Sequence, residues 1–143
     1  PSEAERDAAL AEFYTPYAEG IAQLVRDRLA AVGRVTIIDV HSFPVEKLPY
    51  ELHDGPRPET CLGTDEFHTS AELLAAATEA MSPAAPISDL ALNTPFAGCY
   101  VPLDQYGTNA HVQAVMLEIR RDVVATRMPE LQAATARLID AIG

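Results

Sequence analysis

Apolar residues recur at helical spacing in three parts of the chain. Between Pro16 and Val32 they lie three or four residues apart, which predicts an amphipathic helix that packs on a sheet and ends at the following glycine. A Thr-Ser-Ala-Glu capping box that begins at Thr69 predicts a second helix, which runs through Met81. A third amphipathic helix is predicted from Pro129 to the end of the sequence. The inward face of the first helix is expected to contain Tyr17, Ile21, Leu24, Val25, Leu29 and Val32.

Short apolar runs between these helices predict strands. The strongest run is Val-Thr-Ile-Ile-Asp-Val-His at residues 35–41, and a second buried strand is predicted at residues 112–119. Shorter runs at 60–65 and 87–92 predict two more strands. The predicted strands at 35–41 and 60–65 are separated by a long irregular segment rich in proline, which is typical of a binding loop or lid. Because helices and strands alternate, we expect one α/β domain over residues 1–143.

Composition and charge exclude several classes of partner. The chain has 143 residues, of which 48% are hydrophobic, and this is enough for one globular domain with a core. A net charge of -11 with ten Lys and Arg argues against DNA, RNA and anionic membrane surfaces. No apolar run is long enough to span a bilayer, so we expect a soluble, cytoplasmic protein. The two cysteines, Cys61 and Cys99, have no CxxC spacing and are expected to be reduced.

Ionisable residues interrupt both predicted core strands near their carboxyl ends. Asp39 and His41 are two positions apart, so they share one face of the first strand. Glu118 lies near the end of the last strand, where an unpaired charge would be costly to bury. Ligands of open α/β sheets bind at the carboxyl ends of strands, so these residues form a candidate site. The structural alternative is a hydrogen-bonded histidine and an ion pair from Glu118 to Arg120 or Arg121.

This set of side chains suits metal-assisted hydrolysis. A histidine would hold a divalent metal, a glutamate would manage the proton of a water molecule, and an arginine would hold an anionic substrate. The sequence lacks the Gly-x-Ser-x-Gly elbow of serine hydrolases, the HExxH motif and glycine-rich phosphate loops. Ser42 adjoins His41, but neighbours on a strand point to opposite faces. Serine hydrolysis is therefore disfavoured.

Four short blocks of the sequence resemble the N-formylglutamate amidohydrolases in both order and spacing. The similarity covers roughly Tyr14 to Asp122, and the four blocks together are more specific than any one of them. The blocks are Asp39-Val40-His41-Ser42-Phe43, Cys61-Leu62-Gly63-Thr64-Asp65, Asn93-Thr94-Pro95-Phe96-Ala97-Gly98 and Glu118-Ile119-Arg120-Arg121-Asp122.

The resemblance implies a three-layer α/β/α sandwich similar to the zinc-dependent exopeptidases, and zinc-dependent hydrolysis of N-formyl-L-glutamate to formate and glutamate. Carried over by position, His41 would be a zinc ligand and Glu118 the general acid/base. Asp39 would orient the site. The carboxylates of the small-molecule substrate would be held by residues from the group Arg57, Asn93, Arg120 and Arg121.

Members of that family are generally longer, and their amino-terminal half adds a histidine-glycine motif and an acidic residue to the metal shell. A catalytic zinc usually has three protein ligands, and the resemblance supplies only His41. The remaining ligands are therefore expected outside this chain segment, which would be the carboxyl-terminal part of a larger domain. Alternatives are a shortened relative without metal, a zinc amidase for another acyl or cell-wall amide, and a non-catalytic binding domain. The sequence leaves the oligomeric state open.

Overall fold

The computed structural model describes residues 1–51, 54–82 and 89–143. The chain forms two compact units. The first contains Pro1–Val35 and Val101–Val112, and the second contains Thr36–Tyr100 and Gln113–Gly143. In the described residues, every helix is too short or too polar to traverse a lipid bilayer.

The first unit is built on one long helical segment. It runs through α1 (Glu3–Ala9), a π-helical turn η1 (Leu10–Tyr14) and α2 (Thr15–Val32). A capping box at Ser2 begins it, because the Ser2 hydroxyl accepts from the Glu5 amide at 3.3 Å while the Glu5 carboxylate accepts from the Ser2 amide at 2.8 Å. Gly33, at φ 75°, ends α2 in the left-handed conformation. The predicted helix 16–32 is therefore present as α2 and ends at Val32 as expected, but its amino end continues directly from η1 and is not a new helix start.

The predicted burial of that helix is wrong for much of its apolar face. Val25 is the buried residue of α2, whereas Tyr17, Leu24 and Val32 are at least half exposed. Hydrophobic spacing identifies the apolar side of a helix, but it does not specify what covers that side. The loop 101–112 does contact the helix, since Arg26 forms a 2.9 Å ion pair with Asp104.

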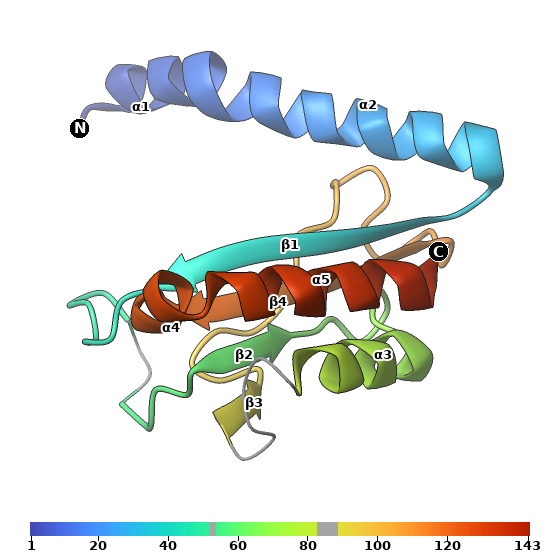
Figure 1. Ribbon diagram of the computed structural model, residues 1–143. Coiled ribbons are helices and arrows are strands. Elements are labelled where there is room, and N and C mark those ends of the chain that lie inside the picture. Colours follow the sequence, from blue (N-terminus) through green and yellow to red (C-terminus); the bar gives the residue numbers. More distant parts are fainter. Residues whose placement is uncertain (52–53, 83–88) are drawn as a thin grey trace. The chain divides into compact units, whose positions relative to one another are not determined.

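The second unit is organised around a four-stranded sheet with the order β1-β4-β2-β3 (Figure 1). Strand β2 pairs in parallel with β3 and antiparallel with β4. All four predicted strands are present; for the prediction at 87–92, the strand begins at Leu90 and residues 87–88 lie outside the described residues. The strands are β1 (Val35–Phe43), β2 (Thr60–Gly63), β3 (Leu90–Leu92) and β4 (Val112–Arg120).

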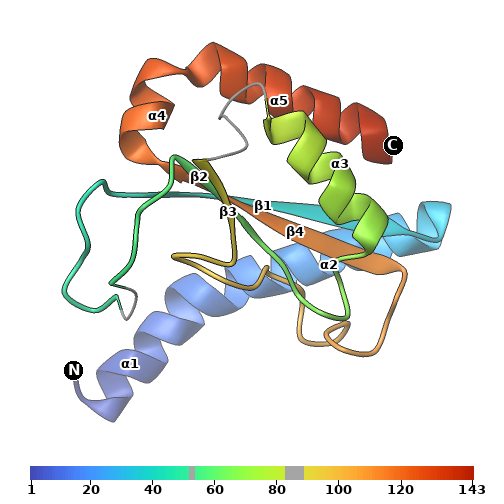
Figure 2. The same cartoon turned by 90° about the horizontal axis from the view of Figure 1, so that it is seen from below.

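Three helices cover one face of this sheet (Figure 2). They are α3 (Ala71–Met81), α4 (Arg121–Thr126) and α5 (Met128–Ile142). Alternate residues of β4 point into the core beneath α3 and α5, and each fully buried leucine there contributes about 1.5–3 kcal/mol. The core contains Leu62, Leu73, Ala77, Ala80, Met81, Val115, Leu117, Ile119, Val123, Leu131, Ala134 and Leu138.

The mixed α/β class predicted from the sequence is confirmed. Helices α3, α4 and α5 form one layer against the sheet of the second unit. A second helical layer, and with it the three-layer sandwich of the zinc exopeptidases, stays a prediction. So does a single domain over residues 1–143.

Candidate active site

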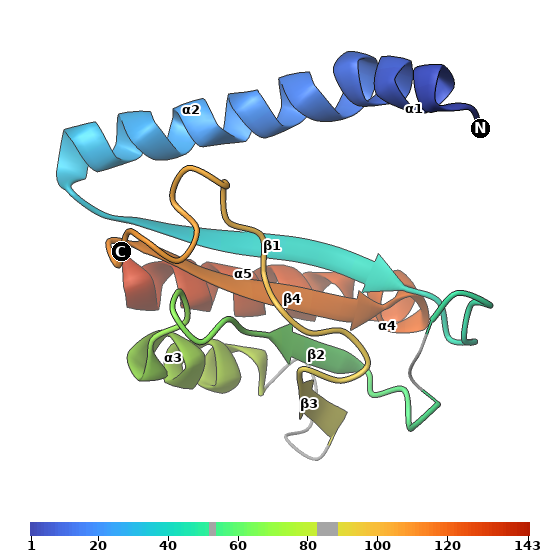
Figure 3. The same ribbon diagram turned by 180° about the vertical axis from the view of Figure 1, so that it is seen from behind.

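Asp39, His41 and Glu118 lie on the sheet face opposite to α3 and α5. On β4, Leu117 and Ile119 belong to the core, so Glu118 between them faces the other way. On β1, Ile38 packs against the same core, so Asp39 and His41 point to the opposite face, which is the face of Glu118. Strands β1 and β4 are neighbours, and Figure 3 shows that their arrows point to the same edge of the sheet. Their carboxyl ends therefore bring the three side chains to one region.

The Asp39 carboxylate holds the imidazole of His41. His41 Nε2 lies 2.8 Å from Asp39 Oδ1, and the other carboxylate oxygen accepts a hydrogen bond from the Tyr100 amide at 3.2 Å. The backbone of the segment that follows Gly98 thus fixes the carboxylate, which in turn orients the ring. The imidazole remains half exposed, with 50% of the side chain accessible to solvent.

Glu118 is a buried carboxylate with an unsatisfied oxygen. The residue is 8% exposed, and its Oε2 has no hydrogen-bond partner among the described residues. Burial raises the pKa of Glu118; the charge of His41 opposes this shift, while the charges of Asp39 and Glu51 add to it. The ion pair that would have made Glu118 a structural residue is not formed by Arg120, which pairs with Asp122 at 2.8 and 3.0 Å instead. A carboxyl with raised proton affinity in a cluster of charges is typical of a general acid/base.

Two of the motif blocks interlock beside this cluster. Asn93 has a positive φ of 56°. Its side-chain Oδ1 accepts from the Thr64 backbone N–H, and its side-chain Nδ2 donates to the Thr64 hydroxyl, both at 2.8 Å. A Cβ on Gly63 would lie 2.2 Å from the carbonyl oxygen of Gly98, so the loop passes directly over that glycine. The Asn93 side chain is thus committed to closing the loop.

The predicted substrate-binding arginines differ in what they contact. Arg57 is held by Glu51 and by the Pro44 carbonyl, and Arg120 by Asp122 and by the Arg57 carbonyl. Arg121 is exposed at the start of α4 and has no partner in the part of the chain that the structure describes. Substrate binding by any of these residues stays a prediction.

Zinc binding by His41 stays a prediction. Within 1–51, 54–82 and 89–143, no three side chains of His, Cys, Asp or Glu converge as a metal site. His68 is fully buried beside the Phe67 ring, and His53 lies outside the described residues. Among the described residues of the second unit, His41 is therefore the one imidazole beside the carboxylate cluster.

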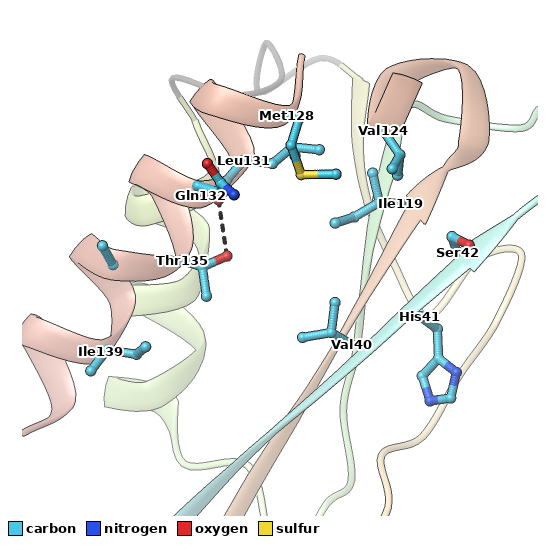
Figure 4. A pocket seen from close by; sticks show the side chains of 11 residues that line it. Val40, His41, Ser42, Ile119, Val124, Met128, Leu131, Gln132, Thr135 and Ile139 are labelled. Carbon is cyan, nitrogen blue, oxygen red and sulfur yellow. Dashed lines mark hydrogen bonds between the residues drawn. The ribbon is translucent and has the colours of Figure 1, made fainter. Parts of the chain in front are cut away.

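An apolar groove of about 520 Å³ opens on the other face of β1 (Figure 4). Val40 points into it, whereas the His41 ring points away from it, because neighbours on a strand face opposite sides. The groove is therefore separate from the carboxylate cluster. It is lined by Val40, His41, Ser42, Ile119, Val124, Met128, Leu131, Gln132, Thr135, Ala136 and Ile139.

Sequence reasoning missed the roles of three residues in the site region. Glu51 lies in an irregular segment with no periodic pattern, so no signal marked it. Phe43 and Phe96 pack edge to face at 5.5 Å, and each ends or interrupts a motif block, so their shared aromatic character was an available signal.

Comparisons with known proteins agree with the motif blocks. The family model described as N-formylglutamate amidohydrolase matches residues 1–125. The N-formylglutamate deformylase of Pseudomonas aeruginosa is 35% identical over 119 residues, which is 83% of this chain and 44% of that protein.

Two crystal structures share the fold. An N-formylglutamate amidohydrolase from Ralstonia eutropha JMP134 has a TM-score of 0.71 at 18% identity, over 96% of this chain and 53% of that one. A gene product from Agrobacterium tumefaciens has a TM-score of 0.65 at 22% identity, over 99% of this chain and 55% of that one. This chain therefore spans about half the length of its relatives. The family predicted from the four motif blocks is confirmed: the chain belongs to the N-formylglutamate amidohydrolases.

Proposed function

We propose that this chain carries the acid/base part of an active site that hydrolyses the amide bond of N-formyl-L-glutamate to formate and glutamate. The observation that carries the proposal is Glu118, a buried carboxylate with an unsatisfied oxygen on the same sheet face as the Asp39–His41 pair. Family membership and the name of the Pseudomonas aeruginosa relative support the substrate.

Each residue has a distinct role in the proposed reaction. Glu118 takes a proton from the attacking water and returns it to the amine of the departing glutamate. Its raised pKa suits both halves of this cycle, because the carboxyl binds the proton more readily than an exposed glutamate does. Asp39 holds the His41 ring in one orientation through the 2.8 Å contact. Arg121, whose guanidinium is exposed, is the proposed contact for a substrate carboxylate.

Zinc is part of the proposal, with His41 as the residue of this chain that would bind it. Zinc, when bound, would supply a Lewis acid to polarise the formyl carbonyl. The described residues fit only part of such a shell, so the other ligands would come from outside them. The family resemblance and the exposed imidazole support this assignment.

Formate release from N-formyl-L-glutamate by the purified protein tests the proposal. Glu118→Gln should reduce the rate by a factor of about 10²–10⁴, the usual contribution of a general acid/base. The matched control is Glu66→Gln, because Glu66 is exposed on the turn that follows β2. Release that is equally fast in the Glu118 variant would reject the catalytic assignment. Preferential cleavage of another acyl amino acid or of a cell-wall amide would keep the site and change the substrate.

A chimera tests the same idea on a complete relative. This chain would replace the matching segment of the Pseudomonas aeruginosa deformylase, which covers 44% of that protein. A folded chimera that releases formate, and loses this activity with Glu118→Gln or His41→Ala, would support the proposed roles. A folded chimera without activity would contradict them. Added chelator followed by zinc would measure metal dependence in the same assay.

A further inference from the structure

Arg57 connects the carboxyl ends of both strands that carry the candidate site. Its guanidinium donates to the carbonyl of Pro44, directly after β1, at 2.8 and 3.2 Å. Its own carbonyl accepts from Arg120 Nη1, at the end of β4, at 2.6 Å. A third contact is the ion pair with Glu51 in the intervening loop. One residue thus links β1, β4 and the loop between β1 and β2.

The guanidinium of Arg57 has little capacity left for a ligand. Nε, Nη1 and Nη2 all donate to Glu51 or to the Pro44 carbonyl, and the planar group lies 5.0 Å above the centre of the Phe43 ring. The side chain is 12% exposed and that of Glu51 is 4% exposed. Binding of a substrate carboxylate in the same fork would require Glu51 to leave, and a buried carboxylate without its partner is costly.

Packing connects Arg57 to the chemistry on the sheet. Phe43 shares the strand face of Asp39 and His41, and its ring packs on Phe96 at 5.5 Å. The Phe96 carbonyl accepts a long contact from the Cys61 thiol, at 3.4 Å. Cys61 is in turn the direct partner of Glu118 in the β2–β4 ladder. A shift of Arg57 would therefore pass through two aromatic rings to the wall beside Glu118.

We propose that Arg57 is a positioning residue that fixes the ends of β1 and β4, with Glu51 as its buried counterion, and that it does not bind the substrate carboxylate. This inference rests on the proposed function for its kinetic consequences. Its structural part, the fixing of the two strand ends, stands on the hydrogen bonds alone.

The kinetic test compares three substrates that differ in their carboxylates: N-formyl-L-glutamate, N-formyl-L-glutamine and the α-amide of N-formyl-L-glutamate. Arg57→Lys keeps the positive charge but loses the fork, so we expect kcat to fall about ten- to a hundredfold for all three substrates alike. The ratios of kcat/KM between substrates should stay within about twofold of the wild type. If Arg57→Lys lowered kcat/KM only for the substrates that carry one particular carboxylate, the inference would be overturned, because such a selective loss shows that Arg57 contacts that carboxylate. Arg26→Lys is the matched control, since Arg26 pairs with Asp104 at 2.9 Å within the first unit.

Hydrogen exchange gives a readout that does not depend on activity. Arg57→Lys, and the milder Glu51→Gln, should speed amide exchange in residues 36–43 and 113–120 while leaving α3 unchanged. Unchanged exchange at the strand ends in both variants would overturn the inference. If the wild type cleaves none of the three substrates, the proposed function fails, and the exchange experiment alone then decides whether Arg57 fixes the strand ends.

Discussion

Replacing Glu118 by glutamine is expected to stabilise the protein at pH 7 while it removes the proposed activity. The carboxylate is 8% exposed and one of its oxygens lacks a hydrogen bond among the described residues. Leaving such a buried polar group unsatisfied costs about 1–3 kcal/mol, and more when it is charged. A neutral amide of the same shape is cheaper to bury. We therefore expect the variant to gain about 1–3 kcal/mol in free energy of unfolding at pH 7.

The pH dependence identifies the cause of this gain. Burial holds the pKa of Glu118 in the folded protein above the ordinary glutamate value of 4.5. Below the unfolded pKa both states are protonated and the carboxyl carries no penalty. As the pH rises, the unfolded state ionises first, so the wild type loses stability until the pH passes the folded pKa. The advantage of the glutamine variant should thus be present at pH 7, shrink as the pH falls from the folded pKa towards 4.5, and be nearly absent below 4.5.

Urea unfolding at pH 7 and pH 4 measures both effects, with the m-value as a check that the unfolded states match. Glu66→Gln serves as the control, because an exposed substitution is expected to change stability by less than about 0.5 kcal/mol. A Glu118 variant that is no more stable than the wild type at pH 7, or whose advantage is the same at both pH values, would refute the argument from burial.

Three further predictions concern the residues beside the cluster. Gly63→Ala places a methyl group 2.2 Å from the Gly98 carbonyl oxygen and should destabilise the protein by about 1–3 kcal/mol or more. Gly20→Ala lies inside α2, where the added Cβ meets no other part of the protein within 4 Å, and should stabilise it by about 0.5–1 kcal/mol. Thermal melts of both variants test whether the two changes have opposite signs. Cys99, whose pKa is raised to about 11 mainly by burial, should react with iodoacetamide about ten times faster for each pH unit between 7.5 and 9.5, and a plateau in that range would contradict the raised pKa. Asn93→Gly loses both hydrogen bonds to Thr64 but still adopts the positive φ easily, whereas Asn93→Ala loses the hydrogen bonds and is also strained at that φ. The glycine variant should therefore lose less free energy of unfolding than the alanine variant. The opposite order in chemical denaturation would contradict the role of φ.

The sequence predicted the strands that position the site because their signals are local. The run at 35–41 is apolar enough to specify β1, and a lone glutamate in the apolar strand 112–119 marked Glu118 before any contact was known. The short helix α4 was missed, since its six residues are too few to show a period. Glu51 was missed because its role depends on Arg57, six residues further along an irregular loop. Long-range pairing of this kind leaves no pattern in the chain.

The distribution of charge around Glu118 supports its proposed acid/base role. The carboxylates of Asp39 and Glu51 both raise the pKa of Glu118. The first is in contact with His41 and the second with Arg57, so two of the three carboxylates have a close cationic or potentially cationic partner. The unfavourable electrostatics are thus concentrated on Glu118, where burial and two negative neighbours all raise the proton affinity. An apolar residue of similar size at this position would remove the penalty, so the proposed chemistry gives a physical reason for a carboxyl here.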